Sequence, residues 1–255
     1  MYYVIQERLW KEFEWDDLIK AMDRLELEYE VVKLRPFIDD IEFETDRKDV
    51  FVFGALKMAR ITPKYGWYPG VLMTPNHDFQ VYREHYKENL LNYDSTIHLF
   101  GNLDLIRDSF VRPTLDTKTF TGKVFTPSEW REHREYSLKN GHVTTLTENT
   151  EVQVAPIKNI QKEFRFFIVD GKLITGSLYK EGYFIRYDSI VDEGAKDFCN
   201  EMIKVFDLAP AYVMDICLTD GEWKIIECGT VNCAGLYKIN IPLLLMALED
   251  KFNGK

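Results

Sequence analysis

The sequence predicts a mixed α/β protein (α+β) built from more than one unit, and three observations lead to this prediction. The chain has 255 residues, of which 45% are hydrophobic and 14% aromatic, so it can bury one large core or two to three small ones. The first third alternates between strand and helix patterns. The last third carries two Asp-Gly dipeptides between alternating strands, which is typical of antiparallel hairpins.

The first third is expected to form a small α/β unit. In chain order we expect a strand at 2–6, a helix at 15–25, strands at 29–34 and 50–53, and a helix at 78–91. The first helix follows from apolar side chains at helical spacing, with Asp16 and Asp17 as candidate caps. The VFVF run at 50–53 is typical of a strand that is buried on both faces of a parallel sheet.

The middle and last parts are expected to be richer in antiparallel strands. Residues 108–125 predict two strands joined by a Thr-rich polar loop, then a helix at 128–140 with Ser128 as its cap, and β structure at 143–156. The expected elements after that are strands at 163–169 and 172–179, a helix at 193–206, strands at 212–218 and 223–228, and a helix from Pro242.

The charge distribution disfavours nucleic acid as a partner. The net charge is −10, so the chain as a whole repels phosphates. Residues 1–105 carry 13 basic and 20 acidic side chains, residues 106–150 carry 7 and 6, and residues 151–255 carry 12 and 16. The middle stretch is therefore the place where an anionic ligand is least repelled.

The chain is expected to be a soluble cytoplasmic protein. It has no apolar core of signal-peptide length and no run of about 20 apolar residues, the length that a membrane span needs. Its four cysteines lack zinc-finger and C-x-x-C spacing, which is typical of reduced thiols in a cytoplasm. P-loop, G-x-G-x-x-G, H-E-x-x-H and G-x-S-x-G motifs are missing, and the five histidines have no metal-binding spacing, so a histidine-centred hydrolase is disfavoured.

A pair of carboxylates in the last hairpin is the strongest chemical signal. Asp215 lies in an otherwise apolar strand, where a carboxylate is costly to bury unless it is paired or bound to a cation. Glu227 occupies the matching inner position of the return strand. A two-residue turn at 220–221 would send them to opposite faces, whereas a three-residue loop at 219–221 places both on one face as diagonal neighbours. We expect the three-residue loop.

These carboxylates are candidate ligands of Mg²⁺, with Asn232 as a neutral third oxygen. Mg²⁺ commonly takes one or two carboxylates and completes its shell with phosphate oxygens and water. The alternative is that Glu227 is an edge carboxylate paired with a lysine such as Lys224 or Lys238. The sequence leaves both interpretations open.

Basic side chains form a second candidate constellation, in or just after the stretch that is not acidic. They are Arg112, Lys118 and Lys123 around the Thr-rich loop, Lys158 in the following link, and Arg165 on a strand. A mobile loop with a lysine can close over a triphosphate, while an arginine on a strand offers a fixed fork to phosphate oxygens. The alternative for each of them is a solvated surface charge.

The order of these parts resembles an ATP-grasp protein, and more narrowly the small RimK-like ligase relatives of that superfamily, found often in bacteriophage and bacterial genomes. The matching stretches, within about residues 108–240, are FVRPTLDTKTFTGKVF, VQVAPIKNIQKEFRFFIVDGKLITGSLYK and VMDICLTDGEWKIIECGTVNCAGLY. The resemblance implies an ATP-grasp fold with a preceding α/β domain at 1–105, a small ATP-grasp subdomain at 106–154 and a C-terminal subdomain with the metal site at 155–255. Both ATP-grasp subdomains are expected to have antiparallel sheets.

The resemblance also implies roles for individual residues. Arg165 and Lys180 match the catalytic cations near the γ-phosphate and the acyl-phosphate. The implied ATP-binding residues are Arg112, Lys118, Lys123, Gln153, Ala155 and Ile157, the last three in a hinge whose backbone would face the adenine. The implied metal ligands are Asp215, Glu227 and Asn232. Many relatives read Glu-x-Asn where this chain has Gly229 in the third position, which puts a second metal in doubt.

The implied activity is an ATP- and Mg²⁺-dependent carboxylate–amine ligation. ATP phosphorylates a substrate carboxylate, and an amine attacks the acyl-phosphate to give an amide, ADP and phosphate. The partners would be a small-molecule or peptide substrate with a carboxylate and an amine acceptor, in the host cytoplasm if the chain is phage-encoded. The alternatives are an ATP-binding module that has lost catalysis, suggested by Gly229, and a phage interaction protein, suggested by the aromatic-rich first third.

Overall fold

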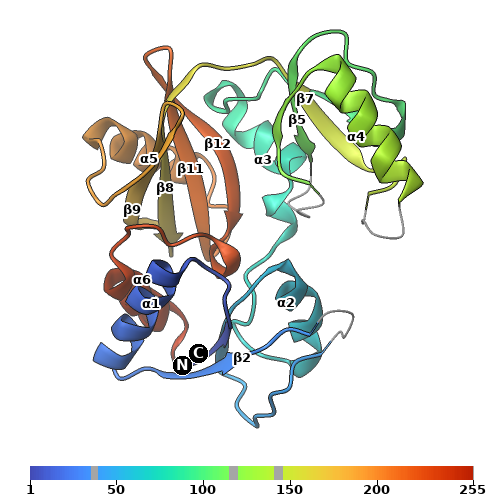
Figure 1. Ribbon diagram of the computed structural model, residues 1–255. Helices are drawn as coiled ribbons and strands as arrows, with labels where there is room; N and C mark the ends of the chain where they lie inside the picture. Colours follow the sequence, from blue (N-terminus) through green and yellow to red (C-terminus); the bar gives the residue numbers. More distant parts are fainter. Residues whose placement is uncertain (36–39, 115–119, 141–145, 255) are drawn as a thin grey trace.

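The computed structural model describes residues 1–35, 40–114, 120–140 and 146–254. Within these residues the strands form a three-stranded, a four-stranded and a five-stranded sheet. Figure 1 shows the five-stranded sheet above the N-terminal sheet, with the four-stranded sheet and its helix to one side. The mixed α/β prediction is therefore confirmed. No helix in the described ranges has the length and hydropathy that crossing a membrane requires.

The N-terminal sheet is parallel, with the order β2-β1-β3. Its elements are β1 (Tyr2–Gln6), α1 (Glu12–Arg24), β2 (Glu28–Val32), β3 (Val50–Phe53) and α2 (Leu56–Ile61). The helix α1 begins one turn before the predicted caps, after Lys11. The VFVF strand is buried on both faces as predicted, because Phe51 and Phe53 enter one core and Val50 and Val52 another.

The four-stranded sheet is antiparallel, with the order β4-β7-β5-β6. Its elements are β4 (Thr96–Leu99), β5 (Ser109–Pro113), β6 (Lys123–Phe125), α4 (Pro127–Lys139) and β7 (Glu151–Ala155). The cap of α4 is Thr126 rather than the predicted Ser128: its Oγ1 accepts from Glu129 N at 3.2 Å. The strand β4 precedes residue 106, the predicted start of the middle unit, and the three-unit division stays a prediction.

The five-stranded sheet is antiparallel, with the order β10-β9-β8-β11-β12. Its strands are β8 (Ile160–Val169), β9 (Lys172–Glu181), β10 (Phe184–Asp188), β11 (Ala211–Thr219) and β12 (Glu222–Thr230). The helices α3 (Phe79–Tyr86) and α5 (Glu193–Val205) cover one face, and α6 (Ile241–Phe252) packs against the other together with α1. Short 3₁₀ helices span Thr62–Tyr65, Pro75–His77, Lys87–Asn89, Phe100–Asn102 and Val231–Cys233.

Alternation along β8 and β11 decides where this sheet is apolar and where it is polar. Even-numbered residues such as Phe166 and Met214 enter the core under α3 and α5. Odd-numbered residues point to the other face, where Phe167 and Val213 join a core shared with α1, α6 and the N-terminal sheet. Beyond that core the same face continues with charged residues of β8, β11 and β12.

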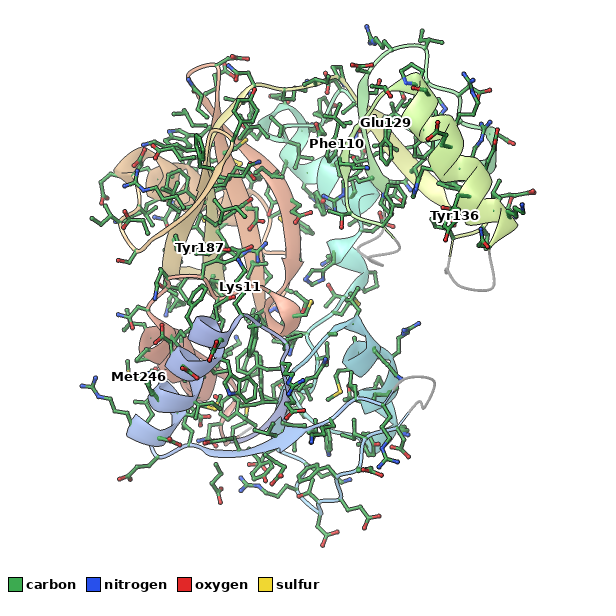
Figure 2. All side chains as sticks on the ribbon, in the orientation of Figure 1. Lys11, Phe110, Glu129, Tyr136, Tyr187 and Met246 are labelled. Carbon is green, nitrogen blue, oxygen red and sulfur yellow. The ribbon has the colours of Figure 1, made fainter. Side chains whose placement is uncertain are left out.

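The first unit also contacts the edge of the large sheet directly. Lys11, at the start of α1, donates to the hydroxyl of Tyr187 on β10, and its Nζ lies 4.7 Å from the centre of that ring. Figure 2 shows the two side chains meeting between the helix and the sheet. At the other end of α1 and α6, the Met1 amino group pairs with Glu249 at 3.1 Å, so the termini are held together.

Candidate functional site

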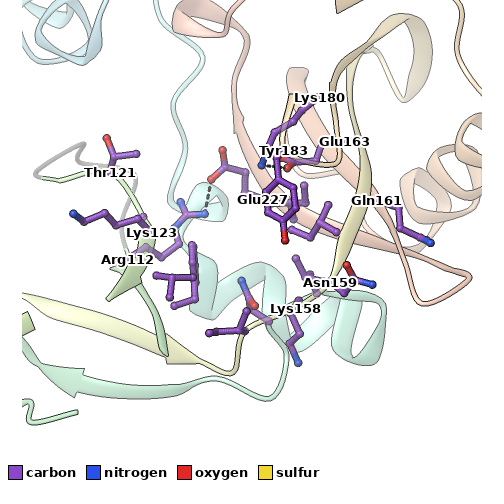
Figure 3. A pocket seen from close by; sticks show the side chains of 18 of the residues that line it. Arg112, Thr121, Lys123, Lys158, Asn159, Gln161, Glu163, Lys180, Tyr183 and Glu227 are labelled. Atoms are coloured by element: carbon purple, nitrogen blue, oxygen red, sulfur yellow. Dashed lines mark hydrogen bonds and ion pairs between the residues drawn. The ribbon is translucent and has the colours of Figure 1, made fainter. Parts of the chain in front are cut away.

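A cavity of about 1260 Å³ lies between the four-stranded and five-stranded sheets. Figure 3 shows Arg112 and Lys123 on the side of the small sheet and Glu163, Lys180 and Glu227 facing them from the large sheet. The wall between them is the link from β7 to β8, at residues 156–161. Apolar side chains of the lining include Phe110, Val124, Ile157 and Tyr183.

The β11–β12 hairpin places both predicted carboxylates on the cavity side, although not through the loop that we expected. Thr219 pairs with Glu222, so the turn has two residues, Asp220 and Gly221, both with positive φ. The predicted three-residue loop is therefore wrong. A β-bulge changes the register farther along, because Ile216 pairs with Ile225 while Asp215 pairs with Glu227.

The bulge brings the acidic side chains closer than the sequence analysis assumed. Ile226 is the extra residue, and without it the two-residue turn would pair Asp215 with Ile226. Because directly opposed residues share a face, Asp215 and Glu227 are immediate cross-strand neighbours rather than diagonal ones. The inserted residue therefore replaces the odd loop as the cause of their common face.

A second bulge lies on β9 at the same end of the sheet. Phe164 pairs with Leu178 while Glu163 pairs with Lys180, so Tyr179 is the extra residue. The Tyr179 hydroxyl reaches the cavity face, where it donates to Glu163 Oε2 at 2.9 Å. Bulges re-aim side chains next to functional sites, and here they collect groups from β9 and β12 on the face already occupied by Arg165 and Asp215.

Each acidic side chain on this face is paired with a cation. The pairs are Lys180 with Glu163 at 2.5 Å, Arg165 with Asp215, and Arg112 with Glu227. Arg112 comes from β5 of the small sheet, so its pair with Glu227 crosses the cavity. The alternative partners of Glu227 are excluded, because Lys224 pairs with Glu222 at 2.8 Å and Lys238 with Asp17 at 3.4 Å.

The pair of Arg165 and Asp215 is the most buried of these. The guanidinium donates through Nε to Oδ1 at 2.8 Å and through Nη2 to Oδ2 at 2.7 Å, and the side chains are only 12% and 4% exposed. Burial raises the pKa of Asp215, and the charge of Arg165 opposes that rise. Although burial opposes it, the carboxylate keeps the pKa of Arg165 well above its ordinary value. The rings of Tyr179 and Tyr237 lie 5.7 and 5.0 Å from the guanidinium carbon.

The sequence matches a family model described as an ATP-grasp domain, the third family of its clade, over residues 57–248. The chain belongs to this ATP-grasp family. Similar solved structures include D-cycloserine synthetase DcsG, with a TM-score of 0.64, 11% identity and 99% of each chain covered. They also include the ATP complex of the D-alanine–D-alanine ligase from Bacillus anthracis, with a TM-score of 0.61, 14% identity and coverage of 98% of this chain and 96% of that one.

A third similar structure is a RimK-domain ATP-grasp protein from Sphaerobacter thermophilus DSM 20745, with a TM-score of 0.58, 10% identity and coverage of 91% and 92%. At these identities the likeness shows a common fold. A search of curated protein sequences found no significant match. The predicted ATP-grasp fold and the resemblance to RimK-like relatives are thereby confirmed.

The cavity of this ATP-grasp protein contains part of the set predicted to bind ATP. Arg112, Lys123 and Ile157 line it. Gln153 and Ala155 are buried in β7 and do not belong to the lining, and Gln153 Oε1 instead accepts from Ser95 Oγ at 3.4 Å. The predicted phosphate-binding Lys118 lies outside the described residues. The ATP-binding roles of these residues stay predictions.

Asn232 does not serve the cavity. Its Oδ1 accepts from Leu72 N and from Thr230 Oγ1, both at 2.8 Å, and its Nδ2 donates to Val52 O at 2.6 Å and Gly70 O at 3.2 Å. The residue is fully buried, and this use of both oxygen lone pairs leaves none for a metal. The predicted metal-ligand role is therefore wrong; Asn232 instead fastens the end of β12 to the N-terminal sheet.

The remaining predicted ligands fit a Mg²⁺ ion that is bound together with phosphates. Among the described residues no cluster of three or more histidine, cysteine or acidic side chains could hold a metal alone. Asp215 and Glu227 nevertheless face each other across one strand pair, and one or two carboxylates are what Mg²⁺ commonly takes. Glu227 is the more accessible ligand, with 35% of its side chain exposed.

The sequence analysis assigned no role to Glu163 or Tyr179. A signal existed for Glu163, because it lies two residues before Arg165 and must share its face of the strand. Tyr179 gave no such signal, because its place depends on a bulge.

Proposed function

We propose that this ATP-grasp protein is an ATP- and Mg²⁺-dependent carboxylate–amine ligase that forms an amide through an acyl-phosphate. One observation carries the proposal: Arg112, Lys180 and paired carboxylates converge from two sheets on a cavity of about 1260 Å³. Family membership supports ATP as the nucleotide. The similar folds include a D-cycloserine synthetase and a D-alanine–D-alanine ligase, which support the ligase class.

The side chains of the cavity offer what such a reaction needs. A carboxylate and a triphosphate repel each other, and the cations Arg112, Lys123 and Lys180 offset that repulsion at the point of phosphoryl transfer. Asp215 and Glu227 would hold Mg²⁺, which neutralises charge on the phosphates when it is bound. Arg165 lies behind Asp215, where it fixes the carboxylate through two bonds.

Both ligand-binding steps compete with the ion pair that crosses the cavity. Glu227 Oε2 accepts from Arg112 Nη1, so that oxygen becomes available to a metal only when Arg112 moves. Phosphate oxygens attract a guanidinium as strongly as a carboxylate does. We therefore infer that nucleotide phosphates take Arg112 from Glu227 while the metal takes Glu227.

A nucleotide-binding module without catalysis is the second candidate. It is favoured by Gly229, which offers no side chain at the position where many relatives carry an asparagine, and by the commitment of Asn232 to the N-terminal sheet. The interaction-protein alternative has weaker support: Trp10, Trp15 and Trp67 pack against cores, whereas Tyr68 is 51% exposed. A phage origin and a host-cytoplasmic location stay predictions.

Binding of ATP tests the site, and release of ADP tests the reaction. With Mg²⁺ present, calorimetry should detect ATP binding that Glu227→Gln weakens by about tenfold or more. The matched control is Glu222→Gln on the same strand, which removes an exposed carboxylate paired with Lys224 outside the cavity. It should leave the affinity unchanged.

A screen of amino acids and peptides for ADP release, with mass spectrometry of the products, then separates the two candidates. An ATP-dependent adduct with a new amide bond supports the ligase. ATP binding without ADP release across the panel supports the inactive module. Absence of ATP binding would overturn both.

A further inference from the structure

The hydroxyl of Tyr179 lies between two of the ion pairs that line the site. It donates to Glu163 Oε2 at 2.9 Å and lies 3.4 Å from Asp215 Oδ2. Glu163 is in turn paired with Lys180, and Asp215 with Arg165. One phenol therefore connects a lysine–glutamate pair that faces the cavity to an arginine–aspartate pair buried behind it.

The backbone is arranged to put this hydroxyl there. Tyr179 is the extra residue of the β9 bulge, which lets it share a face with its neighbour Lys180. Its ring packs beside the guanidinium of Arg165 and lies 5.2 Å from the ring of Tyr237. The ring is thus fixed on both sides, and the oxygen has little freedom to leave the carboxylates.

The hydroxyl acts as a hydrogen-bond donor and not as an acid or base. Burial, and the negative charges of Asp215 and Glu163, raise the pKa of Tyr179 well above its ordinary value. The phenol therefore stays protonated over the whole range in which the protein is folded. Having one proton, it donates to one carboxylate at a time, and the shorter contact is with Glu163.

We propose that Tyr179 is a positioning residue of this site: it fixes Glu163, and through Glu163 it holds the Lys180 ammonium at the cavity wall. Exposure differs along this chain of contacts, since the Lys180 side chain is 38% exposed and that of Glu163 only 10%. Lys180 is thus free to reach a ligand, while its carboxylate partner needs a second anchor to stay in place. Tyr179 provides that anchor.

The inference deepens the proposed function and rests on it in one respect only. If Lys180 leaves Glu163 to contact a phosphate, Glu163 loses its cation but keeps the hydrogen bond from Tyr179. A buried carboxylate with no partner at all would be costly, so this bond lowers the energy needed to release the lysine. The positioning of Lys180 itself can be tested without any nucleotide.

The test measures how fast limiting acetic anhydride acetylates Lys180 in the folded protein, by peptide mass spectrometry, with the exposed Lys123 as internal reference. Tyr179→Phe removes one oxygen and keeps the ring beside Arg165. We expect it to raise the rate at Lys180 by at least about threefold relative to Lys123, because a loosened Glu163 protects the ammonium less. Glu163→Gln should raise the rate as well.

The double variant decides whether Tyr179 acts through Glu163. If it does, adding Tyr179→Phe to Glu163→Gln changes the rate by less than about 1.5-fold, since the two side chains belong to one contact chain. Multiplying effects, or an unchanged rate in Tyr179→Phe alone, would overturn the proposal. The matched control is Tyr212→Phe, which makes the same change on the opposite face of the sheet and should leave Lys180 unaffected.

The same variants keep this inference separate from the ligase proposal. If the wild-type protein binds no ATP, the ligase proposal fails while the acetylation result still stands. If it is a ligase, Tyr179→Phe should lower kcat for ADP release by about tenfold with a smaller change in KM for ATP. Loss of folding alone would lower Tm without accelerating Lys180 relative to Lys123, which counts against positioning.

Discussion

Replacing Asp215 by alanine should cost this protein much of its stability, quite apart from any effect on a metal. The substitution leaves the Arg165 guanidinium without its carboxylate at a site where 12% of the arginine side chain is exposed. Removing one partner of a buried ion pair typically costs about 3–5 kcal/mol, because the remaining charge stays desolvated. Ring contacts with Tyr179 and Tyr237 remain and offset part of that loss.

We therefore expect the free energy of unfolding to fall by about 3 kcal/mol, which corresponds to a decrease in Tm of roughly 6–12 °C for a chain of this size. Urea titration followed by circular dichroism at 25 °C measures the first quantity, and a thermal scan the second. The double variant Arg165→Met/Asp215→Ala removes both charges and should recover at least about 2 kcal/mol of the loss.

The reasoning fails if Asp215→Ala costs less than about 1 kcal/mol, or if the double variant is less stable than the single one. The expected outcome also bears on how the metal site is tested. Loss of ATP binding in Asp215→Ala would reflect a damaged fold as well as a missing ligand. Glu227 is the better target, because its side chain is 35% exposed and its replacement disturbs the core less.

Further predictions concern packing, pH and thiol reactivity. Gly176→Ala should destabilise the protein by about 1–3 kcal/mol in urea titration, because its Cβ would lie 2.5 Å from Phe166 Cδ1 and 2.9 Å from Arg165 O; an unchanged midpoint would contradict this. Burial lowers the pKa of His77 below its ordinary 6.5, so the unfolded chain takes up the proton first as the pH falls. Tm should therefore decrease between pH 7 and 5, and His77→Asn should make that decrease smaller; an identical slope would refute the assignment. Cys199, Cys217 and Cys228 are buried and Cys233 is half-buried, so a thiol reagent should label Cys233 first in the folded protein, and early labelling of Cys217, whose pKa burial raises to about 12, would be inconsistent with the structure.

Patterns along the chain predicted most of the secondary structure. Runs such as VFVF, the Asp-Gly turns and the apolar helical spacings depend on neighbours in sequence, and strands β1, β3, β8 and β11 lie where those patterns indicate. The elements that were missed, α2, β4 and β10, are short, and the two strands lie at sheet edges with mostly exposed side chains. Such segments carry little periodicity, because one or both faces are in water.

Register was harder to predict than element type. A bulge adds one residue without a mark in the sequence, and it reverses which side chains share a face for everything beyond it. The sequence analysis expected Asp215 and Glu227 on one face, and they are, but Ile226 in the bulge is the cause rather than the turn. The same effect hid Tyr179, which no pattern on β9 connects to Glu163.

The sequence by itself determined which groups are available: an acidic pair in an apolar hairpin, cations in the stretch that is not acidic, and an order of parts that identifies an ATP-grasp protein. Only the tertiary structure decided their partners. Arg112 meets Glu227 across the cavity between two sheets, and Asn232 fastens β12 to the N-terminal sheet rather than serving a metal. The physical reason is that hydrogen bonds and ion pairs depend on distances of a few ångströms between residues more than a hundred positions apart, which packing sets and local sequence patterns do not record.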